Sequence, residues 1–117
     1  TCRGMQYINV MFGGKLWYHP KLPVNRTRGV DHQVWLVKEQ RNIWVNNYHS
    51  DCIYEEGLAS CFEPLAIDRE NHVVEAYGSD EMKILALQWH PERRFETANA
   101  YEETRKIILD FIQKYVK

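Results

Sequence analysis

Cysteine is scarce in this chain of 117 residues, which has three: Cys2, Cys52 and Cys61. An odd number of cysteines in so short a chain does not make a disulfide framework. The sequence has no C-x-x-C pair and no cysteine–histidine group at zinc-finger spacing, so it carries no structural zinc motif. We read Cys52 and Cys61 as inert thiols. The pattern favours a reducing compartment, and we expect a cytoplasmic protein.

Long hydrophobic runs and blocks of like charge are also missing. No apolar run approaches the ~20 residues that a membrane-spanning helix needs, and no signal-peptide pattern opens the chain. The 15 basic and 16 acidic residues nearly cancel, so we expect neither nucleic acid nor a membrane as a partner. What is present is an ordinary globular composition, 44% hydrophobic and 13% aromatic, which fits one domain at most.

The pattern of apolar residues predicts a helix, a long loop, several strands and a closing helix. The first helix is expected over residues 2–12, where Gly13 and Gly14 end it. Residues 15–31 are interrupted by prolines and are interpreted as a loop, of a length that is often functional. Strands are expected at residues 32–37, 42–45, 64–67, 72–77 and 83–89, a short helical turn within 53–62, and the closing helix at 98–117. This order indicates the second half of an α/β unit.

The first chemical motif is Thr1-Cys2-Arg3-Gly4-Met5-Gln6, at the start of the predicted helix. A cysteine in a strand-to-helix turn is held up at the edge of a sheet, and the amino terminus of the helix favours a thiolate there. The same terminus offers backbone N–H groups to an oxyanion. An amino-terminal threonine such as Thr1 can also act as a nucleophile, but the turn motif explains more of these residues.

The second motif is Gln88-Trp89-His90-Pro91-Glu92, at the end of the strand expected over residues 83–89. A histidine at the end of such a strand projects into the crevice where α/β proteins place their active sites. Thiol, imidazole and carboxylate together are the set that acyl transfer to sulfur requires. His19, His32 and His72 lie in no such motif, and we read them as surface or packing residues.

These motifs resemble those of the class I glutamine amidotransferase family. The first looks like the family's G-x-C-x-G-x-Q and the second like its Q-[WF]-H-P-E. A third segment, residues 45–49 with the sequence VNNYH, looks like the V-N-S-[FLY]-H of the γ-glutamyl hydrolase-like branch. The resemblance spans residues 1 to about 95. It implies an α/β fold, a flavodoxin-like three-layer sandwich with a mostly parallel sheet, of which residues 1–117 would be the C-terminal half of a single domain.

The resemblance also implies a reaction and a set of site residues. Cys2 would be the nucleophile, His90 the general base and Glu92 the group that orients it. The backbone N–H of Arg3 would hold the oxyanion. By the same resemblance, the γ-glutamyl substrate would be bound by Gln6, Asn47, Tyr48 and His49.

A γ-glutamyl amide would then be cleaved through a cysteine thioester, with release of glutamate. No metal or organic cofactor is implied. The expected partners are a small γ-glutamyl substrate and the N-terminal half of the same domain, and the resemblance leaves a homodimer open. Two other functions stay open as well. One is a glutaminase subunit that delivers ammonia to a synthetase, and the other is an amidotransferase-like module that binds without chemistry.

Overall fold

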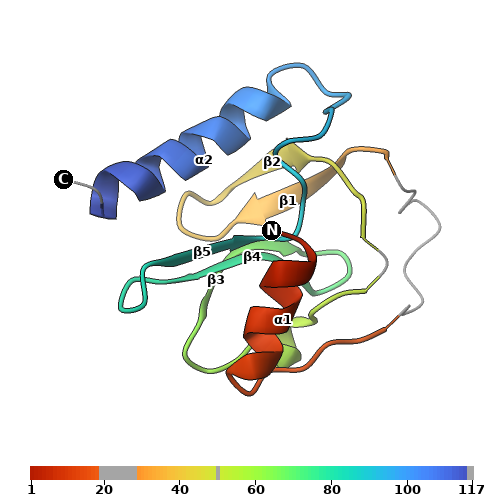
Figure 1. Cartoon of the computed structure of the whole chain (residues 1–117). Helices are drawn as coiled ribbons and strands as arrows, with labels where there is room; N and C mark the ends of the chain where they lie inside the picture. Colours follow the sequence, from red (N-terminus) through yellow and green to blue (C-terminus); the bar gives the residue numbers. More distant parts are fainter. Residues whose placement is uncertain (19–28, 50, 116–117) are drawn as a thin grey trace.

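The computed structural model describes residues 1–18, 29–49 and 51–115 (Figure 1). Most of the loop expected at residues 15–31, and His19 within it, lie outside the described residues. Each predicted helix and strand is confirmed, with bounds that differ by a few residues. The helices are α1 (Arg3–Met11), α2 (Ala100–Tyr115) and the short 3-10 helix η1 (Glu55–Gly57). The strands are β1 (His32–Leu36), β2 (Arg41–Val45), β3 (Glu63–Asp68), β4 (Val73–Ser79) and β5 (Ile84–Leu87).

The five strands form one sheet in the order β2-β1-β3-β4-β5, and every neighbouring pair is antiparallel. The prediction of a mostly parallel, flavodoxin-like sheet is therefore wrong for this chain. The reason is the length of the connections, because parallel neighbours need a crossover of a dozen or more residues. Three of the connections here are short hairpin turns, at residues 37–40, 69–72 and 80–83.

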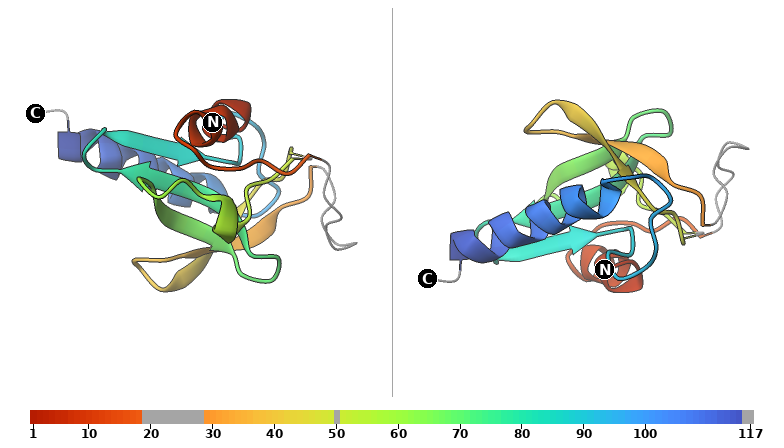
Figure 2. Two further views of the ribbon diagram at one scale, coloured as in Figure 1. Left: turned by 90° about the horizontal axis from the view of Figure 1, so that it is seen from below. Right: turned by 90° about the horizontal axis from the view of Figure 1, so that it is seen from above.

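The two faces of the sheet bury separate apolar clusters. The face toward α2 carries Val34, Leu36, Ile43, Val45, Ala66, Ala76, Leu87 and Trp89. The face toward α1 carries Val74, Tyr77 and Ala86, together with Met5, Ile53, Ala59 and Phe62 from the elements that cover it. The two helices consequently lie on opposite sides of the sheet, as Figures 1 and 2 show.

Strand β4 contains an irregularity that bears on the site. Ile67 of β3 pairs with Val74, and the adjacent Ala66 pairs with Ala76. Glu75 is therefore an extra residue on β4, a β-bulge. Bulges interrupt the alternation of side chains and re-aim one of them, frequently beside active sites. Here the side chain that is re-aimed is a carboxylate with 1% exposure.

Helix α2 is attached to the sheet by a buried hydrogen bond. The indole Nε1–H of Trp89 donates to Oγ1 of Thr104 at 3.1 Å, and both residues are 1% exposed. Ile107 and Ile108 pack against the same apolar cluster. The apolar stripe predicted for this helix is only half-buried, since Ile112 farther along remains 43% exposed. No helix in the described part of the chain is long and apolar enough to cross a membrane.

We predict that Thr104→Val lowers the free energy of unfolding by about 1–3 kcal/mol, because the buried indole N–H loses its acceptor while the side-chain volume is kept. Urea denaturation measures the change. Thr104→Ser is the matched control, since it retains the hydroxyl and should be less destabilised. Equal losses in the two variants would contradict the role of this hydrogen bond.

Candidate active site

Cys2 occupies a strained turn at the start of α1. Its backbone has φ 48° and ψ −108°, in the left-handed half of the map that non-glycine residues avoid at a cost of about 1–3 kcal/mol. Its N–H donates to the carbonyl of Leu87 at 2.7 Å, and its own carbonyl accepts from the N–H of Gln6 at 3.0 Å. The turn therefore holds Cys2 between the last residue of β5 and the first turn of the helix.

The thiol of Cys2 faces a side-chain amide. Nε2 of Gln88 lies 3.6 Å from Cys2 Sγ, and Oε1 of Gln88 accepts from Nε2 of Gln6 at 3.0 Å. Gln6 also donates to the carbonyl of Asp51 at 3.0 Å. Gln6 and Gln88 are both buried, so the thiol stands at the end of a fixed polar chain. Arg3 is the first residue of α1, where a backbone N–H has no acceptor within the helix.

His90 and Glu92 form a hydrogen-bonded pair just beyond β5. His90 Nδ1 lies 2.7 Å from Oε2 of Glu92. The imidazole is largely enclosed, whereas the carboxylate is exposed. The backbone N–H of Glu92 itself, followed by the hydrogen bond and charge of His90, lowers the pKa of the Glu92 carboxyl. An ionised carboxylate beside Nδ1 keeps the proton of the neutral imidazole on that nitrogen. The other ring nitrogen, Nε2, is then free to accept a proton.

Asn46 holds the backbone of His90 from both sides. Its Oδ1 accepts from the His90 N–H at 2.9 Å, and its Nδ2 donates to the His90 carbonyl at 2.8 Å. Asn46 is fully buried at the end of β2. No role was predicted for Asn46 from the sequence, although a buried amide at the end of a strand must find hydrogen-bond partners. Asn46 therefore ties the His-Pro-Glu turn to the β1–β2 hairpin.

The structure brings Tyr48 to the candidate catalytic residues. The Tyr48 and His90 rings meet edge to face with centroids 5.9 Å apart, and the Arg93 guanidinium lies 4.8 Å from the Tyr48 ring centroid. Asn47 is buried beside Tyr48, and its carbonyl accepts from the N–H of Gly29 at 2.6 Å.

His49 turns away from solvent toward a buried carboxylate. Its side chain is 2% exposed, and Nε2 lies 3.4 Å from Oε2 of Glu75. Its Nδ1 lies 2.7 Å from the carbonyl oxygen of Asp51. The other oxygen of Glu75 lies 3.1 Å from Nε2 of His32. Sequence reasoning missed Glu75, although a charged residue inside an apolar strand signals a buried partner.

The two histidines decide the charge of Glu75. Burial by itself would raise the pKa of this carboxyl, but the charge of His49 and the close approach of His32 and His49 to its two oxygens outweigh it. The pKa lies well below its ordinary value. Glu75 is therefore a buried anion, and a buried anion persists in a protein only with partners of this kind.

Asp68 lies close to the same network. One ligand atom from each of His32, Asp68 and Glu75 falls within 4.8 Å of the others, which is a spacing that a cation could use. The carboxylate of Asp68, however, accepts from the turn that follows β3, through the N–H of Glu70 and the side chain of Asn71. Glu75 faces two histidines. We therefore interpret His32, Asp68 and Glu75 as part of an ion-pair network and not as a cation site.

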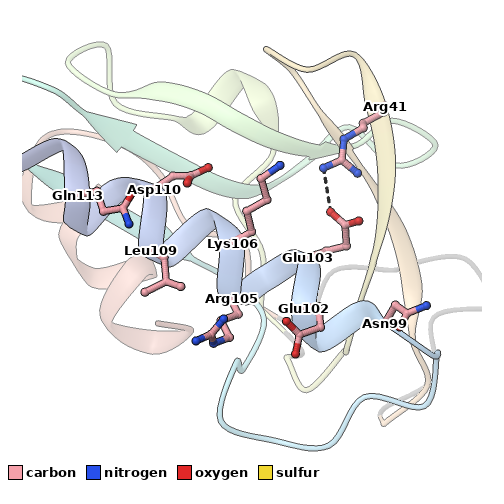
Figure 3. Close-up of a pocket in the computed structure, with 9 residues that line it drawn as sticks. All are labelled: Arg41, Asn99, Glu102, Glu103, Arg105, Lys106, Leu109, Asp110 and Gln113. Carbon is pink, nitrogen blue, oxygen red and sulfur yellow. Dashed lines mark hydrogen bonds and ion pairs between the residues drawn. The ribbon is translucent and has the colours of Figure 1, made fainter.

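A separate groove runs along α2 (Figure 3). Its volume is about 450 Å³, and an ion pair between Arg41 and Glu103 at 2.8 Å crosses one end of it. Charged and polar side chains of both signs line it. The lining includes neither Cys2 nor His90. Its acidic, basic and apolar side chains are mixed, so it does not indicate one class of ligand. The candidate active site therefore lies at the start of α1 and the end of β5.

The depressed pKa of Glu75 makes stability depend on pH. In the unfolded chain this carboxyl returns to its ordinary value of 4.5. Below that pH the unfolded state binds a proton that the folded state does not, so the contribution is complete above about pH 4.5 and is lost as the pH falls through the folded-state pKa. Urea unfolding from pH 7 to pH 3 should show a decline of up to about 1.4 kcal/mol per pH unit from this one group.

The carboxyl of Asp80, whose pKa is also lowered, provides the comparison because it is exposed. Glu75→Gln should flatten the decline, and Asp80→Asn should leave most of it in place. An unchanged slope in Glu75→Gln would contradict the assignment of Glu75 as the buried anion.

Comparison with known proteins identifies the family of this chain. Residues 1–92 match the family model described as Peptidase C26. A glutamine amidotransferase-like protein of Lactococcus lactis, YvdE, is 30% identical in an alignment 113 residues long. The alignment covers 83% of this chain and 46% of that protein. The structure of a candidate GMP synthase subunit from Thermoplasma acidophilum superposes with a TM-score of 0.68 at 22% identity, over 97% of this chain and 56% of that one.

The chain thus spans about half the length of the relatives it matches. At 22% identity the archaeal structure bears on the fold alone. The family match covers most of the chain and includes the Cys2 turn, the segment from Asn46 to His49 and the His-Pro-Glu turn. On this evidence the chain belongs to the peptidase C26 family, in the γ-glutamyl hydrolase branch of the class I glutamine amidotransferase-like proteins.

Proposed function

We propose that this chain carries the catalytic residues of a hydrolase that cleaves a γ-glutamyl amide bond. Cys2 is the nucleophile, His90 is the general base and acid, and Glu92 orients the imidazole. The observation that supports the proposal is that the strained Cys2 turn and the His90–Glu92 pair both adjoin the end of β5. The Cys2 N–H donates to Leu87 at 2.7 Å, and the imidazole lies 2.7 Å from the Glu92 carboxylate.

The reaction divides into two acyl transfers. In the first, Cys2 Sγ attacks the γ-carbonyl carbon, the carbon–nitrogen bond breaks, and the amine leaves with a proton from His90. In the second, His90 removes a proton from water, which attacks the thioester and releases glutamate and the free thiol. The N–H of Arg3 stabilises the oxyanion in both steps. We propose that a second oxyanion donor comes from the half of the domain that this chain does not span.

The substrate would lie between the Cys2 turn and the segment that follows β2. Tyr48 stands against the His90 ring at 5.9 Å between centroids, so its side chain borders the space beside the imidazole. Asn47 precedes it in a buried position. We propose that Asn47 and Tyr48 shape the glutamyl pocket. The segment is stabilised from behind by Asn46, which joins it to the His90 backbone.

Labelling with a diazo-ketone analogue of glutamine tests the proposal. In the full natural polypeptide that contains this chain, peptide mass spectrometry should find the label on Cys2. The Cys2→Ala and His90→Ala variants should lose it. Cys61 is exposed and free, so Cys61→Ala is the matched control and should label at the normal rate. Glutamate should protect Cys2 by occupying the glutamyl pocket.

Absence of a label on Cys2, in a protein that is folded and complete, would overturn the hydrolase and leave an amidotransferase-like binding module. If Cys2 is labelled, hydrolysis of γ-glutamyl-p-nitroanilide compared with hydrolysis of glutamine separates a γ-glutamyl amide hydrolase from a glutaminase. A hydrolase should release p-nitroaniline without a synthetase partner.

A second prediction concerns Asn46. Asn46→Ala removes both hydrogen bonds to the His90 backbone, and the imidazole then loses the support that positions it. A displacement of a catalytic group by about 1 Å can cost roughly 100-fold in rate, so kcat/KM should fall on that order, mainly through kcat. Asn42→Ala is the control, because Asn42 lies exposed on the same strand. Equal activity of the two variants would contradict the role of Asn46.

A further inference from the structure

One hydrogen bond and one ion-pair contact of His49 together favour a particular protonation state. Nδ1 lies 2.7 Å from the Asp51 carbonyl oxygen, and Nε2 lies 3.4 Å from a carboxylate oxygen of Glu75. A carbonyl oxygen only accepts, and an ionised carboxylate only accepts. A neutral imidazole has one N–H and can serve one of them. Both contacts are favourable only when His49 carries a proton on each ring nitrogen.

The Asp51 carbonyl also fixes the orientation of Gln6. Because this carbonyl only accepts, the Gln6 atom that lies 3.0 Å away must be the amide nitrogen. The second N–H of that nitrogen points at Gln88, at 3.0 Å, so the Gln88 atom that receives it must be oxygen. The Asp51 carbonyl therefore determines the orientation of the Gln6 amide, and Gln6 in turn determines the orientation of the Gln88 amide.

Gln88 carries this direction to the thiol. With its oxygen occupied by Gln6, its nitrogen is turned toward Cys2 Sγ at 3.6 Å. An N–H aimed at sulfur favours the thiolate over the thiol, since hydrogen bonds to an ionised acceptor are the stronger ones. Chains of hydrogen bonds in a buried setting also polarise one another. Gln6 and Gln88 are both almost fully buried, so water does not compete along the chain.

We propose that Glu75 is a positioning residue for Cys2. Its buried carboxylate holds His49 as the doubly protonated imidazolium, and that cation anchors the hydrogen-bond chain that ends at the thiol. The position of Glu75 at a β-bulge fits this role, because the bulge directs a carboxylate into an otherwise apolar strand. The backbone carbonyl of Glu75 accepts from the Gln88 N–H at 2.7 Å. The residue that holds His49 and the residue that contacts the Cys2 thiol are therefore joined directly through their backbones.

The charges that face this network come from three strands. His32 of β1 lies 3.1 Å from the second oxygen of Glu75, and Asp68 of β3 belongs to the same group within 4.8 Å. Glu75 itself comes from β4. His49 is thus an interior cation whose nearest charged neighbour is an anion. This inference rests on the proposed function for its consequence, the reactivity of Cys2, but the protonation state of His49 can be measured independently.

The test uses Glu75→Gln, which removes the charge and keeps the shape. A second His–Glu pair, His72 with Glu55 at 3.1 Å, lies exposed on the surface, so Glu55→Gln is the matched control. In the full natural polypeptide, nitrogen-15 NMR of the histidine rings should show His49 doubly protonated at pH 8. An ordinary histidine, with a pKa of about 6.5, is neutral there.

In Glu75→Gln, His49 should become neutral at pH 8, and alkylation of Cys2 by iodoacetamide at pH 7 should slow by about tenfold or more, the order expected when a hydrogen bond to an ionised group is lost. The pH profile of alkylation should move to higher pH. Glu55→Gln should match the wild-type protein in all three readouts. With a γ-glutamyl substrate, Glu75→Gln should lower kcat more than it raises KM, because the chain ends at the nucleophile.

Three outcomes decide the matter. A singly protonated His49 in the wild-type protein at pH 8 overturns the inference, and this measurement needs no variant, so it stands even if Glu75→Gln does not fold. Wild-type alkylation rates in a folded Glu75→Gln also overturn it. If Cys2 alkylation depends on Glu75 but Cys2 never reacts with the glutamine analogue, the positioning role is supported and the hydrolase function is the part that fails.

Discussion

The hydrogen bond from the Cys2 N–H to the Leu87 carbonyl, at 2.7 Å, joins the start of the chain to the last strand of the sheet. Cys2 takes up an unfavourable backbone conformation there, so the turn persists only while the surrounding packing fixes it. Met5, in the first turn of α1, is fully buried, and its carbonyl accepts from the hydroxyl of Tyr77 on β4 at 2.5 Å. Packing of α1 on the sheet thereby keeps the thiol beside Gln88.

Two polar systems adjoin that junction. One is the His90–Glu92 pair, which is held at the backbone by Asn46. The other runs inward through Gln88 and ends at the buried anion Glu75. The first system needs access to solvent and substrate, and its carboxylate is exposed. The second depends on exclusion of water, because a weakly screened charge pair polarises its neighbours more strongly than an exposed one does.

Much of this arrangement follows from short-range patterns. The helical spacing of Met5 and Ile8 predicted α1, and the apolar run before His90 predicted β5. Strand direction did not follow, because the resemblance concerned the whole domain of a longer family, whereas short turns in this chain make neighbouring strands antiparallel. Glu75 and Asn46 were missed for another reason. Their roles depend on contacts with His49 and His90, and such long-range pairing leaves no periodic signal in a single sequence.

The central claim is that Cys2 forms a γ-glutamyl thioester, and rapid acid quench followed by peptide mass spectrometry tests it most directly. The full natural polypeptide would be mixed with a γ-glutamyl amide and stopped within one turnover. The account predicts a glutamyl group on the peptide that contains Cys2, formed at a rate no slower than turnover and removed by hydroxylamine. Steady release of glutamate with no acyl group on Cys2 at any quench time would contradict it.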